Sequence, residues 1–124
     1  MSSVRNVIGD AAAPRQAHGG FEVAGLRSPQ MSMDPYLAID HFVISRPQFR
    51  PHPHAGFSAV TLMFEDSPGS ISNRDSTGTH VTLDPGDLHW TQAGSGIVHE
   101  EVPSEPPTPC HGAQIFIDLP ATVE

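Results

Sequence analysis

The 124-residue sequence contains no lysine, only one cysteine and no long apolar run. Its six basic residues, all arginines, face fourteen acidic residues, which gives a formal net charge of −8. Without a basic cluster the chain lacks the positive surface that neutralises phosphates, so direct binding to DNA or RNA is not expected. No stretch approaches the roughly 20 apolar residues of a membrane-spanning helix, so no membrane association is expected either.

The low cysteine count and the sequence of the N-terminus both indicate the cellular compartment of the protein. A single cysteine, Cys110, excludes an intrachain disulfide, which fits a reducing environment, and its thiol is expected to be buried or in a loop. Residues 1–16 lack the charged-then-apolar layout of a secretory signal. These features predict a cytoplasmic protein, and the length predicts one domain over residues 1–124.

The distribution of turn residues predicts an all-β fold. Thirteen prolines and eleven glycines interrupt any long helical pattern. Short runs rich in β-branched and aromatic residues alternate with the turn sequences DSPG, DPGD and AGSG. Many short strands at this spacing are typical of a sandwich or small barrel. The expected strands cover residues 21–25, 36–44, 57–65, 69–75, 80–83, 87–92, 96–101 and 113–119, although residues 36–44 also allow a short helical turn.

Two of the eight histidines form a distinctive pair in the segment RPHPHAGF, residues 50–57. Because successive side chains of a strand alternate between its faces, His52 and His54 point to the same side, roughly 6.6 Å apart. Pro51 and Pro53 stiffen an extended backbone and remove hydrogen-bond donors, as is usual at a sheet edge. Two imidazoles held in this way can bind one metal ion.

A second pair, in the segment GIVHEE, has the same spacing. His99 and Glu101 share one strand face, while Glu100 projects from the other. Three histidines and one carboxylate suit a borderline divalent ion, namely iron(II), manganese, nickel, copper or zinc. The alternative is that the two pairs are unrelated and exposed, with His99 and Glu101 forming a simple surface ion pair.

Five segments in this order resemble the pirin family of the cupin superfamily: DHF, RPHPHAGFSAVT, RDSTG, PGDLHWTQAGSGIVHEEVP and QIFIDLP. The resemblance covers about residues 20–120. It implies a single cupin barrel, a double-stranded β-helix of the jelly-roll type. It also implies that one metal ion, iron(II) foremost, is held by four residues, which are His52, His54, His99 and Glu101.

The sequence also departs from the family pattern. Ala55 stands where the family usually has arginine, and Ser58 stands where a glutamate is common, so Glu101 has no competitor as carboxylate ligand. Pirins carry two tandem cupin domains, whereas this sequence is expected to contain no second one. We therefore expect a homodimer in which a second copy covers the exposed face. Phe57 and Trp90 are expected to pack in the barrel core, with stacking on a flat ligand as the alternative.

The resemblance implies two possible functions. The first is a quercetin-type dioxygenase, which opens the ring of a flavonol with O2 and releases carbon monoxide. In that case a small aromatic substrate binds at the metal, and Glu101 is both ligand and general base. The second is a non-catalytic, metal-responsive module that regulates a protein partner.

Overall fold

A computed structural model describes residues 15–27, 33–48 and 51–118. Those residues form ten strands and no helix, so the all-β prediction is confirmed. The strands are β1 (Arg15–His18), β2 (Phe21–Arg27), β3 (Tyr36–Ile44), β4 (His52–His54), β5 (Ser58–Met63), β6 (Ile71–Asp75), β7 (His80–Leu83), β8 (Leu88–Gln92), β9 (Ile97–Pro103) and β10 (Cys110–Ile117).

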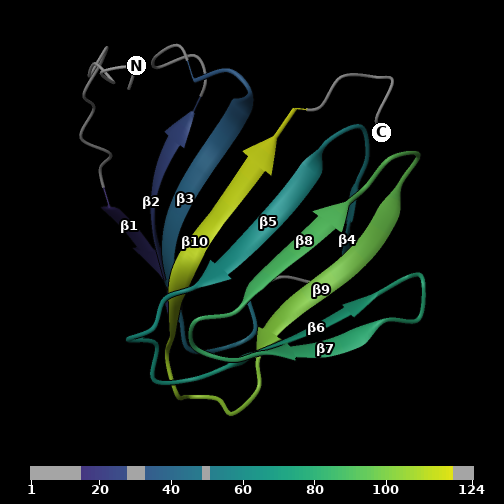
Figure 1. Cartoon of the computed structure of the whole chain (residues 1–124). Coiled ribbons are helices and arrows are strands. Elements are labelled where there is room, and N and C mark those ends of the chain that lie inside the picture. Colours follow the sequence, from purple (N-terminus) through teal and green to yellow (C-terminus); the bar gives the residue numbers. More distant parts are fainter. Residues whose placement is uncertain (1–14, 28–32, 49–50, 119–124) are drawn as a thin grey trace, which may run out of the picture.

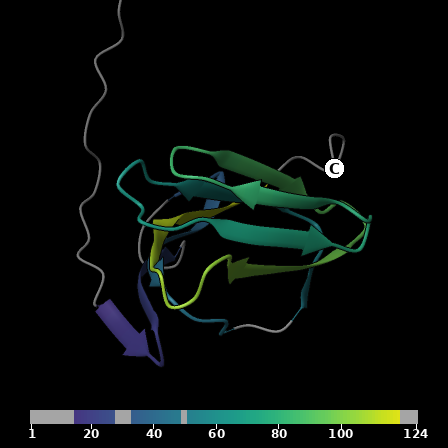
Figure 2. The same ribbon diagram turned by 90° about the horizontal axis from the view of Figure 1, so that it is seen from below.

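The strands pair into two antiparallel sheets. One sheet has the order β1-β2-β3-β10-β5-β8 and the other the order β4-β9-β6-β7. Figure 1 shows β10, near the C-terminus, lying between β3 and β5, so that segments far apart in the sequence become neighbours. The view from below in Figure 2 shows β1 at the periphery of this arrangement. The architecture is that of a single cupin sandwich or barrel.

The hydrophobic core lies between the two sheets. Met63 and Cys110 are fully buried there. The complete cluster takes side chains from both sheets, namely Phe42, Ile44, Met63, Ile71, Leu83 and Cys110. Burial raises the pKa of the Cys110 thiol to about 11, so this cysteine is a packing residue, as expected from the sequence.

Most of the predicted strands are present, with shifted ends. The run 36–44 is strand β3 over its whole length, so the helical alternative is wrong. β9 extends to Pro103 and β10 begins at Cys110, which shortens the proline-rich connection between them. Strand β1 was not predicted, because Arg15–His18 lacks apolar alternation and all four of its residues are exposed. Among the described residues no helix is long and apolar enough to cross a membrane.

The prediction for Trp90 is wrong. Its side chain is 50% exposed, and the neighbouring Leu88 on the same strand face is 59% exposed. In β8 the intervening His89 and Thr91 face the other way, and Thr91 is buried. Strand alternation therefore places Trp90 on the outer face of the six-stranded sheet rather than in the core.

Candidate metal centre

Two short strand segments position the histidine cluster. β4 is a three-residue strand at the edge of the four-stranded sheet and pairs with β9. In this register His52 lies directly opposite His99, and His54 lies opposite Ile97. Pro53 lies between the two histidines of β4, at an edge where a missing backbone donor is tolerated. The backbone thus brings a third imidazole to the His52–His54 pair.

The three imidazoles converge through their Nε2 atoms. The distance from His99 Nε2 is 3.1 Å to His52 Nε2 and 3.0 Å to His54 Nε2. The ring planes are nearly perpendicular, at interplanar angles of 74–84°. Two imidazoles that bind one tetrahedral zinc ion have ligand nitrogens roughly 3.3 Å apart, given bonds of about 2.0–2.1 Å. The cluster is therefore close to the spacing of a metal-ligand set.

Burial lowers the pKa of two of these imidazoles, those of His99 and His54. His99 is 2% exposed, and burial, followed by the proximity of His52 and His54, lowers its pKa to about 4. Burial and the proximity of His52 also lower the pKa of His54. Neutral rings present lone pairs, which is the form that binds a metal. Among the described residues Nδ1 of His99 has no hydrogen-bond partner. The donor set fits a borderline divalent ion.

Glu101 lies beside the cluster without belonging to it. Its carboxylate lines the same cavity as His52 and His54. In the part of the chain that the structure describes, the group of ligand atoms within 4.8 Å of one another consists of His52, His54 and His99 and does not include Glu101. Thr61 Oγ1 donates a 2.9 Å hydrogen bond to Glu101 Oε1. Burial raises the pKa of Glu101, although the Thr61 bond and the His52 charge act in the opposite direction.

The cluster opens onto a cavity of about 540 Å³. Its walls combine aromatic and polar side chains, including Phe21, Phe42, Phe116, Asp40 and Gln114. The Phe57 ring packs against His54 and Phe116, with centroid separations of 5.3 Å and 5.0 Å. Phe57 therefore packs against two residues that line the cavity. The volume falls within the range of small-molecule sites, roughly 300–1,000 Å³.

Sequence reasoning missed a buried polar residue of this site, Asn73. It lies opposite Glu101 in the β6–β9 register, and its side chain is fully buried. Among the described residues neither its Oδ1 nor its Nδ2 has a hydrogen-bond partner. The available signal was the alternation of β6, in which an asparagine stands on the same face as the core residue Ile71.

The chain is similar to several known proteins. The family model named Pirin matches residues 4–117. A pirin-like protein of Solanum lycopersicum is 38% identical over 111 residues, covering 88% of this chain and 37% of that protein. Quercetin 2,3-dioxygenase from Acinetobacter baumannii superposes with a TM-score of 0.70 at 29% identity, over 90% of this chain and 40% of the other.

A more distant likeness concerns the fold alone. The cupin domain of Cnp3 from Schizosaccharomyces pombe has a TM-score of 0.63 at 10% identity, covering 92% of this chain and 76% of that domain's chain. By contrast, this chain spans less than half of the tomato protein and of the Acinetobacter enzyme.

Proposed function

The chain belongs to the pirin family of cupin proteins, and we propose that it is a metal-dependent dioxygenase acting on a flavonol-like phenol. The observation that carries this proposal is the cluster of three histidines at the wall of a cavity, with Glu101 beside them. His52, His54 and His99 would hold the ion, with Glu101 as the fourth ligand. Iron(II), when bound, would supply Lewis acidity and redox chemistry towards O2.

Glu101 is the proton acceptor in this proposal. A phenol reacts with oxygen more readily as its anion, so the site needs a group that removes the hydroxyl proton. Glu101 is the carboxylate next to the histidine cluster, and burial raises its pKa, which makes it a better base than an exposed glutamate. The Thr61 hydroxyl fixes one oxygen, Oε1. The other oxygen, Oε2, would take the proton.

The remaining walls suit a flat aromatic substrate. Phe21, Phe42 and Phe116 supply apolar surface that excludes water from the reacting ring. Asp40 also faces the cavity, but its carboxylate accepts hydrogen bonds of 2.5 Å and 3.2 Å from the Arg27 guanidinium. This pairing engages both carboxylate oxygens of Asp40, which leaves Glu101 as the base.

The test measures O2 consumption and carbon monoxide release with quercetin and iron(II)-loaded protein. We expect turnover in the wild type and a loss of at least about 100-fold for Glu101→Gln, since general bases contribute roughly 10²–10⁴-fold. The matched control is Glu100→Gln, because Glu100 is the adjacent glutamate on the opposite strand face. Equal activity in both variants would contradict the role of Glu101. Failure of a broad phenol panel with metal content verified would contradict the dioxygenase.

One observation favours a second function, that of a metal-responsive regulatory module. Leu88 and Trp90 form an exposed apolar pair on the outer face of the sheet, away from the cavity. Such a pair is typical of a surface that binds a protein. Metal-dependent protein binding without turnover, abolished by Trp90→Ser, would support this function over the first.

We also propose that the same pair lies in a homodimer interface of a cytoplasmic protein. A two-fold axis close to Trp90 would pack each Leu88–Trp90 pair against its counterpart and remove both from water. Sedimentation at micromolar concentration should show a dimer in the wild type and a smaller dimer fraction for Trp90→Ser. A species of 13.3 kDa alone would contradict the dimer.

A further inference from the structure

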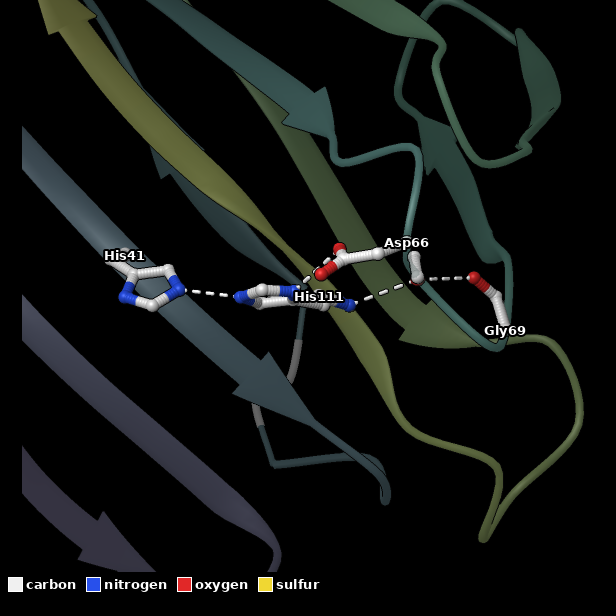
Figure 3. A network of polar contacts seen from close by, with 5 residues as sticks. His41, Asp66, Gly69 and His111 are labelled. Carbon is white, nitrogen blue, oxygen red and sulfur yellow. Dashed lines mark hydrogen bonds and ion pairs between the residues drawn. The ribbon is translucent and has the colours of Figure 1, made fainter.

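A second histidine cluster lies on the outer face of the six-stranded sheet. His41 of β3 and His111 of β10 face each other, with 2.6 Å between their Nε2 atoms. On β3 the neighbouring Phe42 points into the core, so His41 points away from the core and the cavity. Figure 3 shows the two rings in line, with Asp66 on the far side of His111.

The ring of His111 is held in one orientation by groups around it. Its Nδ1–H donates to Asp66 Oδ1 at 2.8 Å, because a carboxylate can only accept. Its backbone N–H donates to Ser67 Oγ, and the Ser67 hydroxyl donates to the Gly69 carbonyl at 2.7 Å. In the neutral ring with its proton on Nδ1, the lone pair is on Nε2, the atom that faces His41.

His41 is positioned by packing instead of a carboxylate. Its ring stacks on Phe64, with centroids 5.6 Å apart and planes 24° apart, and Phe64 also contacts His111 edge-on. Burial, followed by the proximity of His111 and Arg15, lowers the pKa of His41 against the opposing effect of Asp66. His41 therefore favours its neutral form, which can also offer a lone pair at Nε2.

We propose that His41 and His111 form a second binding site for a divalent transition-metal ion, with Asp66 as the orienting carboxylate. A carboxylate on the far nitrogen of an imidazole is the usual outer partner of a metal-ligating histidine. Neutral imidazoles suit zinc, copper or nickel, and water would complete the coordination of a site with two protein ligands. The two Nε2 atoms would separate from 2.6 Å to roughly 3.3 Å on binding, which a small rotation of the His41 side chain provides.

The competing interpretation is a proton shared between the two rings. In that case His41 Nε2–H donates to His111 Nε2, and the pair only links β3 to β10. The two interpretations differ in the number of metal ions that each chain binds. The proposal requires a second metal ion per chain whose binding depends on His41 and His111 and is independent of the cavity cluster.

The first experiment is a Zn²⁺ titration of metal-free protein by equilibrium dialysis. We expect two ions per chain in the wild type, one in His41→Ala, one in His54→Ala and none in the double variant. His18→Ala is the control, because His18 is an exposed histidine on β1 outside both clusters. Retention of the second ion in both His41→Ala and His111→Ala, or a wild type that binds only the ion removed by His54→Ala, would overturn the proposal.

A second measurement needs no variant and therefore avoids any folding defect. Wild-type protein is treated with diethyl pyrocarbonate, and the modification of each histidine is quantified by mass spectrometry. Saturating Zn²⁺ should protect His41 and His111 at least 10-fold while leaving exposed His18 unchanged. Equal modification of His41 and His111 with and without Zn²⁺ would show that the pair shares a proton only, and would overturn the proposal even if the cavity cluster binds metal.

Discussion

The two histidine clusters of this protein use the same side chain in opposite surroundings. The inner cluster is enclosed between the sheets, where His99 is 2% exposed and its Nδ1 lacks a partner among the described residues. The outer cluster lies at the surface, where Asp66 accepts a hydrogen bond from His111. In the inner cluster burial favours the neutral forms of His54 and His99, whereas in the outer cluster a carboxylate fixes the proton of one ring. Enclosure and a carboxylate partner are thus two separate ways to present an imidazole lone pair.

The largest expected effect is the loss of metal affinity when one histidine of the inner cluster is replaced by alanine. His54→Ala should weaken metal binding at the inner cluster by more than about 100-fold, since loss of an outer partner alone costs roughly 10–100-fold. His99→Ala should do the same. His41→Ala is the matched control and should keep the inner ion. Metal analysis of the dialysed proteins checks this, and full occupancy of the inner site in His54→Ala would show that the assignment of ligands is wrong.

The next effect is the pH dependence of the free energy of unfolding. Burial of His99 determines the direction of this dependence. His99 has a pKa of about 4 in the folded protein against an ordinary value of 6.5. Between these values the unfolded chain binds a proton that the folded chain does not, so stability falls as the pH decreases from 6.5 towards 4. The loss for metal-free protein is on the order of 3 kcal/mol.

Urea unfolding of the metal-free protein at pH 7.5 and pH 4.5 measures this effect. His99→Gln should remove most of the pH dependence, because glutamine does not titrate. His111→Gln serves as the comparison from the outer cluster. If His99→Gln keeps the full pH dependence, another group is responsible for it.

A smaller effect is expected when Asp66, which orients His111 without binding the metal itself, is replaced. Asp66→Asn keeps the shape of the side chain but removes its charge, so Zn²⁺ should bind the outer pair about 10- to 100-fold more weakly. The inner ion should be unaffected, because Asp66 contacts only the outer cluster among these histidines. Isothermal titration of Asp66→Asn in the His54→Ala background isolates the outer site. Unchanged outer affinity would show that packing alone orients His111.

The smallest effect is expected for a histidine that belongs to neither cluster. His80 is exposed on β7 and its Nε2 lies 2.9 Å from Ser72 Oγ. His80→Ala should change the free energy of unfolding by less than about 0.5 kcal/mol and leave the bound zinc per chain unchanged. Urea unfolding and metal analysis check both statements. A lost ion in this variant would mean that zinc binds histidines at this surface without a defined site.

Much of the fold could be predicted from the sequence because the strands carry local signals. The run 36–44 is rich in β-branched and aromatic residues, and it forms β3 with the predicted bounds. The buried face of β8 departs from its local pattern, because the apolar residues Leu88 and Trp90 are exposed whereas Thr91 is buried. The expectation that Trp90 packs in the core is therefore wrong, and the smaller Thr91 is buried instead.

The same distinction applies to the two clusters. His52 and His54 are two residues apart, so strand alternation alone predicted that their rings point the same way. His41 and His111 are 70 residues apart, and their meeting depends on the antiparallel register of β3 with β10. Nothing local in the sequence encodes that register. Local spacing therefore indicated the inner cluster, and only the structure reveals the outer one.

The short edge strand β4 has a consequence for how fast the inner site can exchange its contents. Two of the three histidines of the inner cluster lie on this three-residue strand, which pairs with β9 alone. Pro53 removes one backbone hydrogen-bond donor from the strand. Segments with few backbone hydrogen bonds open far more often than the core of a domain. Departure of β4 from β9 would dismantle the cluster while the core around Met63 stays closed. The residence time of a bound ion would then follow the lifetime of one small segment, not the unfolding rate of the whole protein.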